Sequence, residues 1–244
     1  MTDTGGEDAG APVNEPATGG RRNVAPFAAL AVVVVLAALG LGLGLSLSGG
    51  STPVAAGPEG VPLQQAPDLA SADTTASGAP VDGITCRTAA QQVVGYHIHV
   101  HVDVFVNGRL ERIPAGAGIP TPRLEEHFPS GLFFDNSVNG CLYWLHTHTD
   151  DGIIHVESPT RTTFTLGQFF DVWQQPLGPD QVGPARGPVV AFENGVRFTG
   201  NPRDIPLLPH AVVQLDVGSP VVSFVPEQFH VSGLCGAGSQ GCAA

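Results

Sequence analysis

From His97 to Val106 the side chains alternate between two kinds. Successive side chains of a β-strand point to opposite faces of the sheet. One face would carry ligand-type residues, namely His97, His99, His101 and Asp103. The other would carry β-branched residues, namely Ile98, Val100, Val102, Val104 and Val106. The pattern predicts a strand with an apolar core face and a face of metal-ligating residue types.

A second histidine-rich stretch predicts a hairpin. Residues 142–148 and 153–157 are typical of strands, and Asp151-Gly152 between them is a favoured two-residue turn. With that turn, His148 lies opposite His155, and His146 lies opposite Glu157. Directly opposed Cβ atoms are about 4.5–5.5 Å apart, so two imidazoles could share one ion. This register is a hypothesis, and a shift of one residue would separate the ligands.

The two stretches together supply the candidate ligands: His97, His99, His101, His146, His148 and His155. Neutral imidazole binds zinc, copper, nickel and iron. Because Met1 is the only methionine and the cysteines have another expected role, Cu(II) or Zn(II) is favoured over Cu(I). Glu157 is the candidate acceptor for a ligating histidine, or a general base. Alternatively, the histidines form a hydrogen-bonded sheet face that becomes charged below about pH 6.5.

Two Asn-Gly pairs predict further hairpins, at Asn107-Gly108 and within residues 189–198 at Asn194-Gly195. The first would bring Asp103 opposite Arg112 as an ordinary ion pair. Residues 211–217 and 220–225 are expected to be the closing strands.

One amphipathic helix is expected after the second histidine stretch. Thr165 and Gln168 form a capping-box pattern. An apolar stripe with helical spacing follows: Leu166, Phe169, Phe170 and Trp173. The predicted fold class is α+β, a mainly antiparallel sheet of six to eight strands built from hairpins with this helix packed on it.

The N-terminal part predicts a membrane anchor. Residues 26–48 are almost wholly apolar and would span about 34 Å as a helix, enough for a hydrocarbon core of about 30 Å. We assign residues 23–48 as a transmembrane segment and residues 1–22 as a disordered tail. Arg21 and Arg22 precede the span, which places this tail in the cytoplasm and the remainder outside. A cleaved signal peptide or a twin-arginine signal are alternatives, and each also exports the chain.

Beyond the anchor, residues 49–83 are rich in Pro, Ala, Ser and Gly and are expected to be a linker. Residues 84–232 form the expected extracytoplasmic domain, and residues 233–244 a cysteine-containing tail. Four cysteines allow three disulfide pairings. The preferred pairing joins Cys86 to Cys141 and Cys235 to Cys242, since disulfides persist outside the cytoplasm. Thiolate metal ligation is the alternative, but no C-x-x-C spacing supports it.

The formal net charge of the 244-residue chain is −12 at pH 7. An acidic domain of this kind is not suited to nucleic acid or to an anionic membrane surface. The chain contains no lysine, which excludes Schiff-base chemistry and a P-loop.

Several motifs also resemble a known group of proteins: YHIH at 96–99, VFVNG at 104–108, YWLHTH at 143–148, GIIH at 152–155, ESP at 157–159 and FTLGQFFDVW at 164–173. In this combination the chain resembles a family of exported or membrane-anchored bacterial and archaeal proteins without an assigned activity. The resemblance covers about residues 84–226. It implies that the histidine stretches act as a unit, and it implies no reaction.

The expected function is therefore a membrane-anchored extracytoplasmic domain that binds copper or zinc through its histidines. A metal-dependent hydrolase or oxidoreductase is the first alternative, and a metal-free structural module of the cell envelope is the second. Binding without catalysis is favoured, because nucleophilic catalysis has little support: the chain has no Gly-x-Ser-x-Gly motif.

Overall fold

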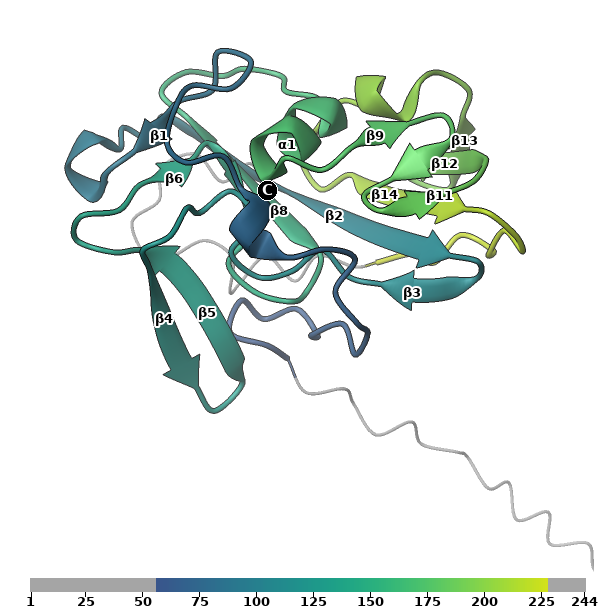
Figure 1. Cartoon of the computed structure of the whole chain (residues 1–244), viewed down its shortest axis with the longest axis horizontal. Coiled ribbons are helices and arrows are strands. Elements are labelled where there is room, and N and C mark those ends of the chain that lie inside the picture. Colours follow the sequence, from purple (N-terminus) through teal and green to yellow (C-terminus); the bar gives the residue numbers. More distant parts are fainter. Residues whose placement is uncertain (1–55, 228–244) are drawn as a thin grey trace, which may run out of the picture. The chain divides into compact units, whose positions relative to one another are not determined.

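The structure is a computed structural model that describes residues 56–227 (Figure 1). The expected cytoplasmic tail (1–22), the anchor (23–48) and the pair Cys235 and Cys242 lie outside the described residues. None of the helices in the described part has the length and apolar character that a membrane span requires.

A seven-stranded sheet forms the centre of the domain, in the order β13-β12-β14-β2-β8-β7, with β3 also paired to β2. Its strands are β2 (Tyr96–Val106), β3 (Arg109–Glu111), β7 (Leu145–His146), β8 (Ile153–Ser158), β12 (Val189–Glu193), β13 (Val196–Phe198) and β14 (Val212–Val217). All its pairings are antiparallel except that of β14 with β2. The predicted α+β class with a mainly antiparallel sheet is confirmed.

Smaller elements surround this sheet. Strand β1 (Cys86–Arg87) pairs with β6 (Leu142–Tyr143), and β4 (Arg123–Phe128) pairs with β5 (Gly131–Asn136). A three-stranded sheet contains β9 (Leu177–Gly178), β10 (Gln181–Val182) and β11 (Ala185–Arg186). Three 3₁₀ helices are η1 (Ala72–Thr74), η2 (Ala89–Gln91) and η3 (Pro202–Asp204). The predicted disulfide between Cys86 and Cys141 is present beside the β1–β6 pair.

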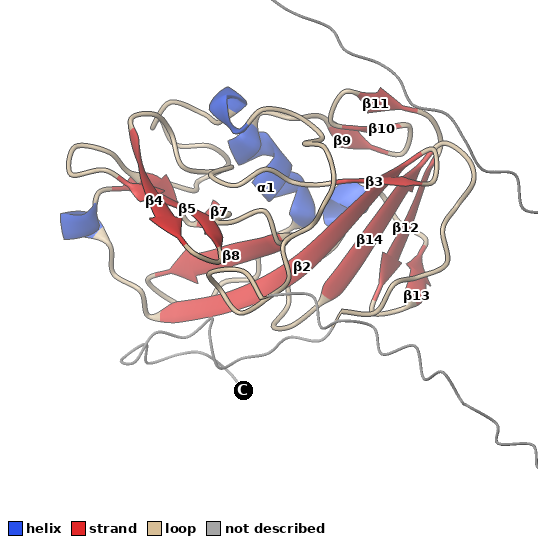
Figure 2. Ribbon diagram, turned by 90° about the horizontal axis from the view of Figure 1, so that it is seen from below, coloured by secondary structure: helices blue, strands red, loops and turns tan. Residues whose placement is uncertain are grey.

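Strand β2 places the apolar core and the histidines on opposite faces of the sheet, as its alternation predicts. Val100, Val102 and Val104 are fully buried in the core cluster. Helix α1 (Leu166–Trp173) covers this apolar face (Figure 2). Its capping box joins Thr165 and Gln168 as predicted, and its four stripe residues are fully buried. The histidine face is therefore left for other segments to cover.

Both Asn-Gly hairpins form with the predicted register. Val106 pairs with Arg109, and Glu193 pairs with Val196. Asn107 and Asn194 adopt left-handed φ values of 50° and 51°, as a type I′ turn requires.

The expected ion pair between Asp103 and Arg112 is absent. Asp103 accepts a hydrogen bond of 2.7 Å from Gln64 instead. Arg112 lies beyond the end of β3 and forms ion pairs with Asp68 and Asp150. The prediction was wrong because carboxylates from other segments are nearer to this guanidinium.

The linker was expected to span residues 49–83, but residues 56–83 are part of the domain because they pack on it. Val61, Leu69, Ala72 and Ala76 are buried. The backbone of this covering segment (residues 56–83) also bonds to the domain, for example from Gln64 N to the carbonyl of Asp150. Its few apolar residues cannot build a core of their own, but they can add to a core that already exists.

The second closing strand, expected at 220–225, does not form. Side chains of β14 accept hydrogen bonds from the backbone of residues 220–225 instead. Val222 N donates to Asp216 Oδ1, and Val225 N donates to Gln214 Oε1. These side chains take the place of a neighbouring strand, so residues 220–225 do not form a β-ladder despite their apolar pattern.

Candidate metal centre

The pairing of β2, β8 and β7 brings four histidines together on one face. His99 lies opposite His155 across β2 and β8, and His146 lies opposite His155 across β7 and β8. His97 is paired with Glu157 at the end of the same ladder. The alternation within β2 therefore positions histidines from two distant parts of the sequence side by side.

The predicted register of the second hairpin is wrong by two residues. His146, and not His148, lies opposite His155. Asp151-Gly152 is not a two-residue turn, because β7 already ends at His146 and only Gly152 of the pair has a positive φ. An even offset keeps side chains on the same face, so His146 and His155 still meet.

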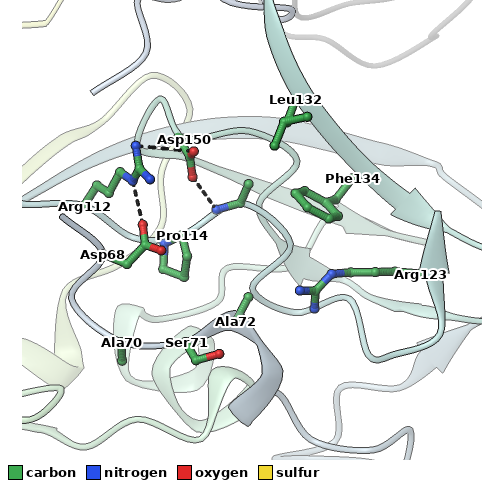
Figure 3. Close-up of a pocket in the computed structure, with 11 residues that line it drawn as sticks. Asp68, Ala70, Ser71, Ala72, Arg112, Pro114, Arg123, Leu132, Phe134 and Asp150 are labelled. Atoms are coloured by element: carbon green, nitrogen blue, oxygen red, sulfur yellow. Dashed lines mark hydrogen bonds and ion pairs between the residues drawn. The ribbon is translucent and has the colours of Figure 1, made fainter. Parts of the chain in front are cut away.

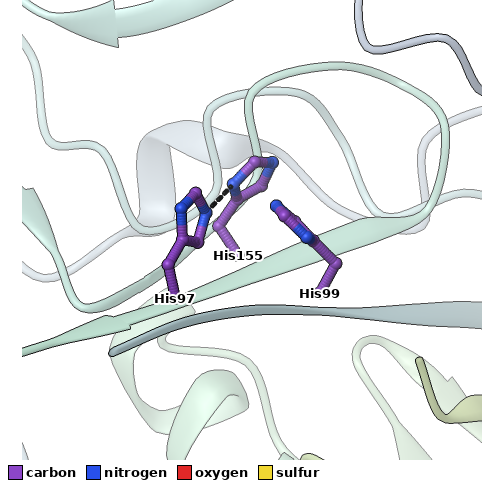
Figure 4. Close-up of side chains that lie close together, drawn as sticks. All are labelled: His97, His99 and His155. Carbon is purple, nitrogen blue, oxygen red and sulfur yellow. Dashed lines mark hydrogen bonds between the residues drawn. The ribbon is translucent and has the colours of Figure 1, made fainter. Parts of the chain in front are cut away.

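Two groups of three histidines could hold a metal ion. One group is His97, His99 and His155 (Figure 4), and the other is His146, His148 and His155. Within each group the ligand nitrogens lie within 4.8 Å of one another. We call these five residues the histidine centre. Four of its members are buried, and His97 is partly buried.

His146 and His148 face each other through nitrogens that carry no proton. Nδ1 of His146 lies 2.8 Å from the carbonyl oxygen of Tyr143, and Nδ1 of His148 lies 2.5 Å from that of Phe134. A carbonyl only accepts, so each Nδ1 is the protonated nitrogen and each Nε2 carries a lone pair. The two Nε2 atoms are 3.0 Å apart. This arrangement favours a cation between them, since neither nitrogen has a hydrogen to donate.

His155 is oriented by a buried carboxylate. Its Nε2 lies 2.7 Å from Glu59 Oε1, and the hydroxyl of Thr149 donates to Glu59 Oε2 at 3.2 Å. Donation from Nε2–H to a carboxylate leaves Nδ1 with a lone pair. Glu59 is only 5% exposed and belongs to the covering segment.

His97 and His99 complete the second half of the centre. Nε2 of His97 lies 3.2 Å from Nδ1 of His155 and 3.5 Å from Glu157 Oε1. Nε2 of His99 is buried and has no hydrogen-bond partner among residues 56–227. A buried imidazole nitrogen without a partner is costly unless an ion occupies the space beside it.

Burial keeps these imidazoles neutral. It lowers the pKa of His146 to about 3, against the opposing effect of the Tyr143 carbonyl. Burial also lowers the pKa values of His148 and His155, and neighbouring histidines lower them further. Neutral imidazole is the form that ligates a metal.

Two buried carboxylates lie next to the centre. Burial raises the pKa of Glu59 and, together with the charge of Glu59, raises the pKa of Asp151 well above its ordinary value. A positive ion in the adjacent histidine centre would oppose this effect of burial, because it favours the ionised form of both carboxyl groups.

His101, the sixth predicted ligand, belongs to neither group. It shares a separate cavity of about 330 Å³ with Asp103 and Gln64. Its Nδ1 lies 3.9 Å from Asp103 Oδ2. The strand alternation predicts the face on which His101 lies, but it does not predict that His101 is excluded from the histidine centre.

The β4–β5 hairpin covers the other side of the centre. Phe133 stacks on the ring of His148 with centroids 4.4 Å apart, and Phe134 N donates to the carbonyl of His148. The opposite side of this hairpin lines a cavity of about 490 Å³ (Figure 3). In that cavity Arg112 pairs with Asp68 and Asp150, while Arg123 lies over Phe134.

Comparisons with family models, with curated proteins and with solved structures gave no match. The resemblance drawn from the sequence motifs therefore stays a prediction, and the chemistry of the site is argued from its own residues.

Proposed function

We propose that this domain binds one transition metal ion, Cu(II) or Zn(II), through His146, His148 and His155. The observation that carries the proposal is the 3.0 Å separation of two Nε2 atoms whose rings are protonated at Nδ1. Two nitrogens at about 2.0–2.1 Å from one ion are about 2.8–3.4 Å apart, for angles between 90° and 109°. The observed separation falls in this range.

The surroundings of the centre support the same function. Ligating histidines usually donate their second ring nitrogen to a carbonyl or carboxylate, which fixes the ring. His146, His148 and His155 have such partners in Tyr143, Phe134 and Glu59. Imidazole donors suit Cu(II) and Zn(II).

Binding is favoured over catalysis by the position of the cavities. A metal-dependent hydrolase or oxidoreductase needs an open coordination position that substrate can reach. The two cavities described above, of about 490 and 330 Å³, are lined by none of the five histidines of the centre.

The test is elemental analysis of the full chain purified without an affinity histidine tag, after dialysis with equimolar copper or zinc. We expect about one equivalent of metal in the wild type and clearly less in the His146→Ala/His148→Ala double variant, which lacks two of the three proposed ligands. His127→Ala is the matched control, because that side chain is 73% exposed on β4. A wild-type protein that stays free of both metals would overturn the proposal.

We also propose that residues 26–48 anchor this domain in the cell membrane, with the domain outside the cytoplasm. Arg21 and Arg22 before the apolar segment support this orientation. The disulfide between Cys86 and Cys141 supports an oxidising compartment. Protease added to intact cells should digest the domain while the chain remains in the membrane fraction. A chain that is protected and recovered in the soluble fraction would contradict the anchor.

A further inference from the structure

The histidine centre has more donors than one ion can use. His97 and His99 form a group with His155 on the side away from His146 and His148. The two groups share only His155. A four-coordinate ion at one group therefore leaves the other pair of imidazoles without a ligand role.

Each ring nitrogen of His155 has a neighbour of its own. Nδ1 lies 3.2 Å from Nε2 of His97, and Nε2 lies 2.7 Å from Glu59. Nδ1 therefore points to the group that contains His97. The separation of 3.2 Å again lies in the range of about 2.8–3.4 Å expected for two nitrogens on one ion.

Two further donors stand at this group. Glu157 Oε1 lies 3.5 Å from His97 Nε2 and offers a carboxylate ligand. His99 Nε2 is buried and has no hydrogen-bond partner in the part of the chain that the structure describes. Together these residues form a three-nitrogen, one-oxygen donor set, which is suited to Cu(II) or Zn(II).

We propose that the centre is dinuclear, with a second transition metal ion bound by His97, His99, Nδ1 of His155 and Glu157. This inference rests on the proposed function, because the second position lies beside the first and shares a residue with it. Because Nε2 of His155 donates to Glu59, this ring offers a single lone pair, at Nδ1. The second ion takes this ligand from the first, which keeps His146 and His148, and it therefore binds more weakly than the first.

The two positions differ in their access to solvent. The side chains of His97 and Glu157 are 12% and 15% exposed, whereas His146 is fully buried. The second ion therefore exchanges faster than the first when a chelator is added.

The test is a titration of the metal-free full chain with Cu(II), read by metal content after dialysis and by electron paramagnetic resonance. We expect two equivalents of copper at saturation. The first equivalent should give the spectrum of an isolated Cu(II) ion. The second should reduce or broaden the signal, because two neighbouring Cu(II) ions couple magnetically.

Variants separate the two positions. His97→Gln should bind one equivalent with the spectrum of an isolated ion at every copper concentration. Glu157→Gln keeps the three imidazoles and should bind the second equivalent more weakly than the wild type. His146→Gln/His148→Gln should lose the first equivalent. The wild-type titration decides the question even where a variant does not fold.

The outcomes distinguish this inference from the proposed function. One equivalent in the wild type with an uncoupled spectrum at saturation would overturn the second site and leave the first in place. Two coupled equivalents in His97→Gln would also overturn it. No bound copper or zinc in the wild type would overturn the proposed function itself.

Discussion

Nε2 of His146 and Nε2 of His148 lie 3.0 Å apart, and neither of them carries a hydrogen. Two buried lone pairs in contact are unfavourable in the metal-free protein. The same contact becomes favourable when an ion occupies the space between them. The stability of the domain should therefore depend on metal.

Removal of metal should lower the thermal stability of the wild type. A ligand present at 100 times its Kd adds about 2.7 kcal/mol to the free energy of unfolding. Thermal unfolding with excess Zn(II) and with EDTA measures this difference. His148→Ala should show a smaller difference in unfolding temperature between the two conditions than the wild type. Identical Tm values of the wild type with Zn(II) and with EDTA would contradict the prediction.

Glu59 should control metal affinity without touching the ion. It accepts the hydrogen bond of His155 Nε2 at 2.7 Å and so fixes that ring. Loss of such a partner weakens metal binding by about 10–100-fold. We expect this loss in Glu59→Ala and a smaller one in Glu59→Gln, whose amide oxygen can still accept. Competition with a chromophoric chelator measures the affinities, and an unchanged Glu59→Ala affinity would refute the role.

Gly152→Ala should destabilise the domain more than Gly83→Ala. Both glycines have a positive φ, of 82° and 78° respectively, so alanine is strained at each. At Gly152 the added Cβ would also lie 2.6 Å from Gln64 Nε2 and 3.0 Å from His101 Nε2. At Gly83 it would meet nothing within 4 Å.

Urea unfolding of the metal-free proteins measures both changes. The strain shared by the two variants should cost about 1 kcal/mol. The steric contacts should add to this only in Gly152→Ala. Equal losses in the two variants would show that Gln64 and His101 move aside freely.

The Cys86–Cys141 disulfide should contribute substantially to stability. It joins residues separated by 55 positions, and the loop-entropy relation gives about 4 kcal/mol for a loop of this size. We expect Cys86→Ala/Cys141→Ala to lower the free energy of unfolding by about 2–5 kcal/mol. Urea unfolding under oxidising conditions checks this value. Addition of a reductant should destabilise the wild type by more than it destabilises the double variant.

Asp103 should make the metal-free domain less stable as the pH rises. Burial, reinforced by the charge of Glu227, raises the pKa of Asp103 to about 7. In the unfolded chain this carboxyl ionises near pH 4, so between about pH 4 and 7 the folded state binds more protons than the unfolded state. The Asp103 contribution to the free energy of unfolding therefore falls through this range and levels off above it.

Asp103→Asn should remove this dependence. Between about pH 4 and 7 the difference in free energy of unfolding between the variant and the wild type should grow by up to about 1.4 kcal/mol per pH unit, in favour of the variant. Its amide oxygen can still accept the hydrogen bond from Gln64. Urea unfolding in EDTA across the pH range measures the gain, with exposed Asp180→Asn as the control. Parallel curves for Asp103→Asn and the wild type would contradict the assignment.

Local signals predict the parts of this fold that depend on neighbouring residues. Each Asn-Gly pair specifies its own turn, because the two residues at the tip supply the left-handed φ values. Thr165 and Gln168 likewise specify the start of α1 within four positions. The alternation in β2 predicts which face is apolar and which carries histidines.

Distant contacts decide the parts that sequence reasoning misses. Residues 147–152 do not make the expected tight turn, because their polar groups bond elsewhere. The Thr147 hydroxyl donates to the carbonyl of Pro114, and the carbonyl of Asp150 accepts from Gln64 N. Such partners lie more than 30 residues away and leave no local pattern.

Glu59 is the site residue that is hardest to predict from the sequence. It lies among glycines and prolines, a composition that predicts a linker. Its role depends on a histidine 96 positions later in the chain. The only available signal is a single acidic residue between Pro58 and Gly60, which is too common to indicate a site.

The contact between Glu59 and His155 joins residues that are 96 positions apart in the chain. During synthesis Glu59 emerges before His155, its partner 96 positions later in the chain. Closing so long a loop has an entropic cost that the contact must offset. An ion bound at His155 would stabilise the closed loop, because it holds the ring that Glu59 contacts.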